Sequence, residues 1–297
     1  MCCCFTQQSK CMNVSHIQYR TFDVHVKLRS IVKCIWSCDA TPNNGDHFIF
    51  RTYASLYPTI IFCKQGWVTP VDDRTRGAVL LLGQANTWCR FRTSQDFKLL
   101  GVTLNPSALP RLFHIAAHEV TNRIYDDKRV FLNDALATFC REVIGHSFNP
   151  KHIINLLTEK NQEDVNYDDP ILPFIMSCFQ CDMRSPVTDL PRQVFMSQRN
   201  FERKFKYYTG FTPKAFTNLA RLIGTINSLS VKTKKLSDTA LEHHYFDQSH
   251  FSNEFKRHTG FQPSVFAKSV DDQRAVWEHF LKFFHTLSIC PPMLCKS

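Results

Sequence analysis

Two groups of polar side chains, fifty residues apart, have the chemistry to contact nucleic acid. Arginine can donate two hydrogen bonds to guanine, asparagine can pair with adenine, glutamate can accept a hydrogen bond from cytosine, and lysine can bind phosphate. The first group is Ser197, Gln198, Arg199, Asn200, Glu202, Arg203 and Lys206, and the second is Gln248, Ser249, His250, Ser252, Asn253 and Lys256.

The spacing of phenylalanines predicts that each group lies on the outward face of a short helix. Phe201 and Phe205 are four residues apart, as are Phe251 and Phe255, so each pair should stack on one buried helix face. Ser197 supplies a side-chain oxygen where the first helix would begin. Any solvated helix can show such a polar face, but two copies at a fixed spacing favour DNA binding.

The two copies belong to a longer repeat, which predicts a tandem supersecondary unit. Gly210 and Gly260 stand where each helix would end in a left-handed cap, and Pro213 and Pro263 follow three residues later to begin the next helix. Pro213 to about Val231 should form one helix. The residues that recur at +50 are Gln198, Phe201, Phe205, Lys206, Thr209, Gly210, Phe211, Pro213 and Phe216.

Residues 187–216 and 236–266 resemble the two helix-turn-helix motifs of AraC/XylS-type transcriptional regulators. The resemblance covers the last third of the chain and implies two such motifs joined by a long helix. It also implies a sequence-specific activator of transcription that binds double-stranded DNA, with RNA polymerase as a further candidate partner. The chain departs from the family at Phe195 and His244, which replace the turn glycine, and at Pro191, which replaces a small helix residue.

The first helix carries the stronger candidates for base recognition. Arg199, Glu202 and Arg203 lie three and four residues apart, and they match the positions of the family that contact bases. Glu202 has an alternative role, because it could orient either arginine through an intrahelical pair. Lys206 lies further along the helix and is better suited to phosphate.

The second helix carries shorter side chains at the corresponding positions. Ser249, Ser252 and Asn253 are uncharged, although Asn253 could still read adenine. Lys256 again suits phosphate. We therefore expect the second helix to contribute weaker specificity than the first.

The composition fits a soluble protein that binds a polyanion. The 297 residues suffice for about two domains, and the formal net charge is +10, although solubility alone would also account for that charge. The sequence shows no secretory leader and no long apolar run, so we expect a cytoplasmic protein without membrane contact. Its 13 cysteines should then be reduced thiols.

The candidate metal ligands form incomplete sets. Cys178 and Cys181 make a single C-x-x-C, which cannot complete a tetrahedral site, and His114 and His118, four apart on an expected helix, lack a third ligand. We therefore expect no metal, no cofactor and no catalytic residue.

Three other classes of protein stay open as alternatives. A DNA-repair alkyl acceptor with AraC-type motifs would need an activated thiolate, but the crowded Cys2, Cys3, Cys4 and Cys11 lie in a segment expected to be disordered. A cupin-type metal enzyme would need clustered histidine and carboxylate ligands, and only His47 falls among the expected strands before residue 104. The third class is a protein-interaction module that has lost DNA binding, as the replaced turn glycines would allow.

The first hundred residues predict a β-rich sandwich or barrel, because short β-rich runs alternate with turn signals. Residues 101–113 lead from a strand into a helix and resemble the cupin-like sensor half of some AraC/XylS-type regulators, which implies a small-molecule effector. Aromatic residues could line a pocket there, although core packing is their commoner use: Trp36, Trp67, Trp88, Phe62 and Phe91. The expected strands are 31–36, 48–53, 59–63, 78–82, 87–92 and 98–104.

The predicted fold class is α+β, with an N-terminal β-rich part and appended helices, followed by an all-α part. The appended helices could pack in the core or form a homodimer interface. The expected helices outside the repeat are 107–118, 132–145, 150–160, 171–182 and an amphipathic 271–287. The expected domains are 1–165 for sensing and dimerisation, 170–270 for DNA binding, and a C-terminal extension at 271–297.

Overall fold

The computed structural model describes residues 10–14, 17–41, 49–72, 77–163, 169–180, 196–231, 242–243, 245 and 247–272. Several sequence expectations lie outside these residues. They concern Cys2 to Cys4, Pro191, Phe195, His244 and most of the amphipathic 271–287. Among the described helices, none is both long and apolar enough to cross a membrane.

The N-terminal half contains two antiparallel sheets. One sheet has seven strands in the order β1-β2-β3-β9-β5-β7-β10, and the other has three in the order β4-β8-β6. The strands are β1 (Lys10–Val14), β2 (Ile17–Phe22), β3 (Val32–Ala40), β4 (Ile49–Thr52), β5 (Thr59–Gln65), β6 (Val68–Pro70), β7 (Val79–Leu82), β8 (Cys89–Thr93), β9 (Phe97–Leu104) and β10 (Ile124–Tyr125).

Alternating side chains of the large sheet build two separate cores. On β5, Phe62 faces the helices, whereas Ile61 faces the small sheet together with Trp36 and Phe91. Trp36 lies flat over Gly101 of the neighbouring strand, where a Cβ would come within 2.0 Å of the ring. The expected aromatic set therefore does not line one pocket, since its members are divided between the two faces of the sheet.

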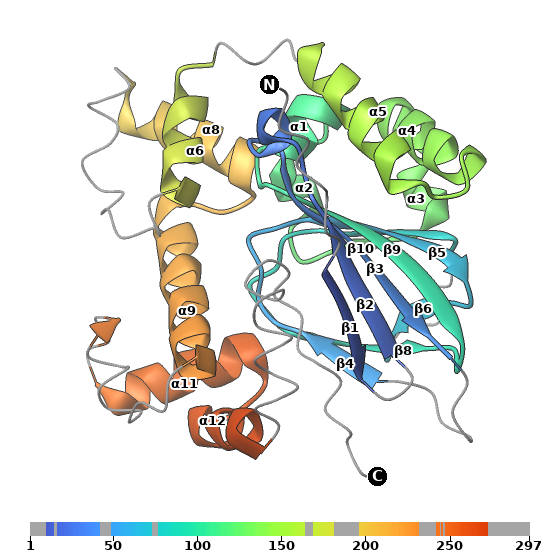
Figure 1. The fold of residues 1–297 in the computed structure, drawn as a ribbon. Helices are drawn as coiled ribbons and strands as arrows, with labels where there is room; N and C mark the ends of the chain where they lie inside the picture. The colour runs from blue at the N-terminus through green and yellow to red at the C-terminus, as the bar shows by residue number, and fades with distance from the viewer. Residues whose placement is uncertain are drawn as a thin grey trace, which may run out of the picture.

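Short helices cover the other face of the large sheet (Figure 1). The single helix expected at 107–118 is wrong: the chain forms α1 and α2 instead. His114 ends α1 in the left-handed conformation with φ 55°, and Ala116 is extended, so His114 and His118 do not share a helix. These helices are α1 (Ala108–Phe113), α2 (Ala117–Val120), α3 (Asp127–Val130), α4 (Asp134–Gly145) and α5 (Pro150–Gln162), and a 3-10 turn spans Val26–Leu28.

The C-terminal half is helical, as the fold class required. Figure 1 shows α9 running from α8 at one end to α11 and α12 at the other. Pro213 begins α9, which extends to Val231 as the sequence predicted, and Pro263 begins α12. The described helices are α6 (Ile171–Gln180), α8 (Gln198–Thr209), α9 (Pro213–Val231), α11 (Gln248–Thr259) and α12 (Pro263–Asp272).

All six expected strands are present, and the extreme N-terminus corrects one expectation. Cys11 lies in β1, which pairs with β2, so the segment around it is not disordered. The signal was available in β2, where Ile17 and Tyr19 are buried and alternate with exposed Gln18 and Arg20. That period-two pattern lets β2 pair with β3 and extend the sheet.

The repeat separates residues that fold the helices from residues that face solvent. Phe205→Ala removes a ring that is 0% exposed, and it should lower the free energy of unfolding by about 3–5 kcal/mol. Arg203→Ala removes an exposed side chain and should change that free energy by no more than about 0.5 kcal/mol. Urea unfolding of both variants checks this, and an equally large loss in Arg203→Ala would mean that the helix faces are assigned wrongly.

Candidate nucleic-acid interface

Helix α8 is held by a cap at each end and a buried pair of rings between them. The Ser197 side chain accepts a hydrogen bond from the Asn200 amide at 3.4 Å, as expected for an N-cap. Phe201 and Phe205 are buried, with ring centroids 5.7 Å apart. Gly210 closes the helix in the left-handed conformation, with φ 81°. The polar face of α8 is therefore fixed outward.

The outward face of α8 forms its own hydrogen bonds. Gln198 Nε2 donates to Glu202 Oε1 at 2.6 Å, and Arg203 donates to Asn200 Oδ1 at 2.9 Å. Glu202 thus pairs with an amide rather than with either arginine, which corrects the intrahelical alternative raised for it. Arg199 and Arg203 both remain exposed.

One cation of α8, Lys204, makes a structural ion pair and is not part of the outward face. Lys204 Nζ lies 2.8 Å from Asp169 Oδ2, and the Tyr208 hydroxyl donates to the same oxygen at 3.1 Å. Asp169 stands just before α6, so this pair ties the start of the C-terminal helices to α8. Lys206, in contrast, is exposed near the end of the helix.

Helix α11 repeats the same construction with different side chains. Asp247 caps its start by accepting from the His250 amide at 2.7 Å, and Gly260 ends it with φ 75°. On the outward side Ser249, Asn253 and Lys256 are exposed. The two left-handed glycine caps expected from the repeat are thus both confirmed.

The remaining members of the second group are also at the surface of α11. Gln248 and His250 are exposed and Ser252 is half-buried. Glu254 points away from this side, because its carboxylate lies 3.4 Å from the Arg221 guanidinium of α9. The structure therefore brings each predicted group together on one helix.

The end of α8 docks on the N-terminal half. Thr121 Oγ1 donates to the Gly210 carbonyl at 3.2 Å and accepts from Gln84 Nε2 at 2.8 Å. Gln84 is fully buried, and its amide also bonds to the Ala117 carbonyl. A Cβ on Gly210 would come within 1.8 Å of the Gln84 nitrogen.

The end of α11 docks on the same half through an arginine. Arg51 of β4 donates to the Thr259 carbonyl at 3.4 Å. Its guanidinium lies 4.4 Å from the centre of the Trp88 ring and 4.0 Å from that of Phe261. A planar guanidinium between two aromatic faces combines stacking with a cation–π attraction.

A histidine completes the second contact. His258 is buried, its Nδ1 donates to the Asn86 carbonyl, and its own carbonyl accepts from the Ala54 amide at 3.0 Å. Burial lowers the pKa of His258, while the Asn86 carbonyl and the Glu254 charge act in the opposite direction. One loop thus contacts both docked helix ends: Gln84 lies against the end of α8, and Asn86 and Trp88 lie against the end of α11.

No pattern in the sequence predicted these docking residues of the N-terminal half. Their contacts with the helix ends join positions between 89 and 208 residues apart, and no periodicity spans such a distance. The nearest signal was the repeated Thr-Gly-Phe, which predicted the helix ends but not their partner.

The described free cysteines do not form a nucleophilic site. Burial raises the pKa of Cys34, Cys38 and Cys140 to about 12, and that of Cys63 and Cys89 to about 11. These side chains are therefore protonated thiols at neutral pH, whereas the thiolate is the reactive form. Cys178 and Cys181 fall outside the described side chains.

Glycine is required at the docked end of α8. Gly210→Ala should lower the free energy of unfolding by at least about 1–2 kcal/mol, because of the left-handed backbone alone, and the clash with Gln84 adds to this loss. Gly145→Ala is the matched control, since no atom lies within 4 Å of its Cβ. Chemical denaturation measures both, and equal stability of the two variants would contradict the docking geometry.

The docking of α11 should weaken in acid. Because burial lowers the pKa of His258, the unfolded chain binds more protons below the ordinary histidine pKa of about 6.5. Stability is therefore fully present above that pH and is lost as the pH falls through the window below it. His258→Gln should reduce the difference between urea midpoints at about pH 7.5 and about pH 5.5. An unchanged difference would show that His258 does not titrate in this way.

Comparison with known proteins agrees with the repeat. A family model described as a helix-turn-helix domain matches residues 190–269, and one described as a domain of unknown function (DUF6597) matches residues 20–126. No curated protein matches the chain.

Solved structures of ToxT from Vibrio cholerae share a loose likeness. ToxT from strain O395 is 13% identical, covering 77% of this chain and 95% of its own, with a TM-score of 0.37. An apo ToxT variant from strain SCE256 is 13% identical, covering 80% and 97%, with a TM-score of 0.40. Residues 190–269, which include α8, α9 and α11, are therefore similar to a helix-turn-helix domain, in agreement with the observed repeat.

Proposed function

We propose that the chain regulates transcription by reading two successive major grooves of DNA with α8 and α11. The observation that carries this proposal is the pair of like-built helices, each with an exposed polar face, joined by α9. The 19 residues of α9 correspond to roughly 28 Å at 1.5 Å per residue. Successive major grooves on one side of DNA are about 34 Å apart, so slight bending of the DNA would let both helices enter.

Base reading is assigned mainly to α8. Arg199 and Arg203 are exposed and long enough to reach guanine, and Arg203 is held by Asn200 in the free protein. Glu202 would have to release Gln198 before accepting from a cytosine amine. On α11 the best base contact is Asn253 with adenine, so the second helix adds less discrimination.

Phosphate contacts are assigned to Lys206 and Lys256, which occupy equivalent positions and are both exposed. They lie about one turn before the glycine caps, beyond the residues that would project into the groove. Such contacts position the protein on DNA without reading the sequence. Lys204 is excluded from this role because Asp169 already neutralises it.

The proposal treats the chain as a regulator without enzymatic activity. The support is the high pKa of the described buried cysteines, which leaves them without the thiolate that an alkyl acceptor needs. The competing function is an interaction module that has lost DNA binding. Selection of binding sites from random duplex DNA separates the two, because only a DNA reader would enrich a motif.

The N-terminal half would act on DNA binding through the helix ends that it holds. Gln84 and Thr121 contact the end of α8, and Arg51, Ala54 and Asn86 contact the end of α11. A change in these contacts would alter how the two helices are spaced. A small-molecule effector, a homodimer interface, contact with RNA polymerase and activation of transcription stay predictions from the family resemblance.

The salt dependence of DNA affinity distinguishes the proposed roles of Arg203 and Lys206 on α8. Arg203→Ala should weaken the free energy of binding to a selected DNA site by about 1–3 kcal/mol, and it should change binding to a scrambled site little. Lys206→Ala should weaken both, and it should reduce the slope of log affinity against log salt by about one unit. Fluorescence anisotropy titrations at several salt concentrations measure this.

The matched control is Lys128→Ala, which removes an exposed cation from α3. It should leave affinity and salt slope at wild-type values. If Arg203→Ala weakens both duplexes equally, Arg203 positions the protein and the base-reading assignment is wrong.

A further inference from the structure

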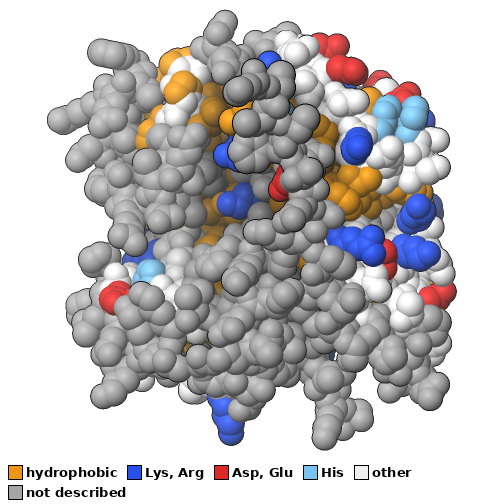
Figure 2. All heavy atoms as spheres, viewed as in Figure 1, with side chains coloured by type: hydrophobic (Ala, Val, Ile, Leu, Met, Phe, Trp, Pro, Cys, Tyr) orange, Lys and Arg blue, Asp and Glu red, His pale blue; other side chains and the backbone are white. Residues whose placement is uncertain are grey.

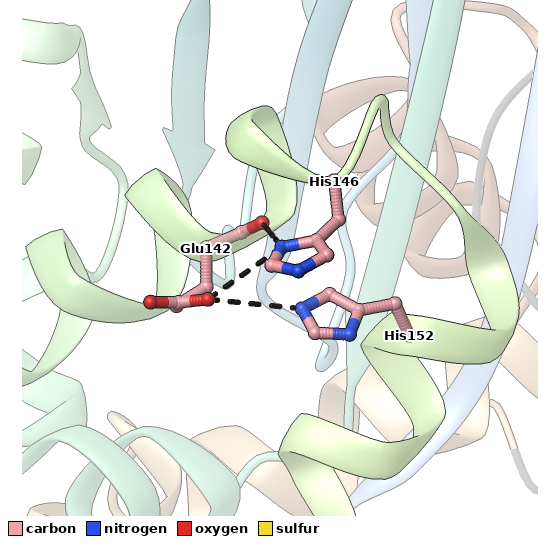
Figure 3. A group of neighbouring side chains, drawn as sticks. All are labelled: Glu142, His146 and His152. Atoms are coloured by element: carbon pink, nitrogen blue, oxygen red, sulfur yellow. Dashed lines mark hydrogen bonds and ion pairs between the residues drawn. The ribbon is translucent and has the colours of Figure 1, made fainter.

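We propose that Glu142, His146 and His152 bind a divalent transition-metal ion, for which Zn²⁺ fits the ligand set. One ligand atom from each residue lies within 4.8 Å of the other two, and Figure 3 shows the carboxylate facing both imidazole rings. Figure 2 shows histidine side chains at the surface over the α4–α5 hairpin. The inference is independent of DNA binding, because these residues lie outside the helices that carry the proposed base contacts.

The fold brings the three residues together through a tight reversal of the chain. Glu142 and His146 are one turn apart at the end of α4, and His152 lies in the first turn of α5. The connecting Ser147 and Phe148 both have positive φ, 53° and 58°. Non-glycine residues adopt that conformation infrequently, so two in succession mark a reversal that the surrounding contacts fix.

The reversal is anchored in the core beneath it. The Phe148 amide donates to the Val143 carbonyl at 3.0 Å, and the Phe148 ring meets the fully buried Phe62 with centroids 6.2 Å apart. The two histidines are therefore presented on well-packed helices rather than on a loose loop. A metal site needs that preorganisation of its ligands.

The distances leave room for an ion. Glu142 Oε2 is 3.8 Å from His152 Nε2, which is longer than a good hydrogen bond, and one ligand atom of each of the three residues lies within 4.8 Å of the others. Ligand atoms about 2.0–2.2 Å from a tetrahedral Zn²⁺ are about 3.4 Å from one another. Rotation of these side chains at the surface would close the site, with ligand atoms approaching one another by up to about 1.4 Å.

A second observation concerns the Nε2 atom of His152, which is available to bind an ion. Its Nε2 is shielded from solvent, yet it has no hydrogen-bond partner among the described residues. A buried polar atom normally has such a partner. The stacked His146 ring, 3.7 Å away between centroids, offers Nε2 as its ligand atom while Nδ1 donates to the Glu142 carbonyl at 3.0 Å.

The ligand types select the class of ion. Two imidazoles and one carboxylate suit zinc, nickel or copper, whereas calcium and magnesium prefer sites made wholly of oxygen. Three protein ligands leave a position for water or for another donor. The bound ion would fasten α4 to α5, the helix whose Asn161 accepts a hydrogen bond from the buried Arg111 at 3.2 Å.

The test titrates untagged, full-length protein with Zn²⁺ by isothermal calorimetry. Wild type should bind one equivalent that is lost, or weakened by at least about tenfold, in His152→Ala and in Glu142→Gln. The control is His118→Ala, which removes an exposed histidine outside the cluster and should bind as wild type does. Zn²⁺ should also raise the melting temperature of wild type and control more than that of the two cluster variants.

Cobalt substitution identifies the ligands, because cysteines elsewhere in the chain can also bind metal. The equivalent lost in the variants should show weak visible bands without the strong near-ultraviolet absorption of cobalt–thiolate bonds. Glu142→Gln preserves side-chain shape, so it keeps the test decisive if His152→Ala does not fold. Equal stoichiometry and affinity in all four proteins, or thiolate absorption from every equivalent, would overturn the proposal.

Discussion

The repeated Thr-Gly-Phe turn is the constraint on which the C-terminal half depends. Thr209 is fully buried, and its hydroxyl donates to the Phe205 carbonyl at 2.8 Å while accepting from the Phe211 amide at 3.3 Å. Thr259 makes the same two bonds, at 2.7 and 3.1 Å. The hydroxyl gives a hydrogen-bond partner to the amide of Phe211 or Phe261, which lies beyond the helix end. It thereby fixes the angle at which the chain leaves each helix, and the following proline starts the next one.

That turn is also where the two halves of the molecule meet, and the two contacts differ in chemistry. The end of α8 meets an uncharged network around Gln84 and Thr121. The end of α11 meets a cation between aromatic rings, together with the titratable His258. Because one loop of the N-terminal half reaches both ends, a displacement of that loop acts on both helices at once. Among the described residues only the second contact contains a histidine, and burial lowers the pKa of that side chain.

Local chemistry explains which features the sequence predicted. The start of α9 at Pro213, both glycine caps and the Ser197 cap depend on residues within one or two turns, so they could be predicted. The break at His114 could not, because a helical pattern continues through it and only tertiary packing holds the left-handed backbone. The pairing of Glu202 with Gln198 could not be predicted either, because the spacing also allowed Glu202 to pair with Arg199 or Arg203. The cluster around His152 could not be predicted, because it depends on a chain reversal through Ser147 and Phe148. Both have positive φ, and neither residue type favours that conformation.

The burial pattern of α8 and α11 limits how the N-terminal half could influence the proposed DNA binding. Their C-terminal ends are covered by it, whereas Arg199, Arg203 and Asn253 stay exposed in the same conformation. In the described part of the chain, the N-terminal half therefore does not cover the proposed base contacts. The docked ends hold α8 and α11 at a set separation and tilt, and the proposed base contacts require that both helices match the groove spacing. A shift of a few ångströms at the docked ends would change that match without covering any of the proposed base contacts.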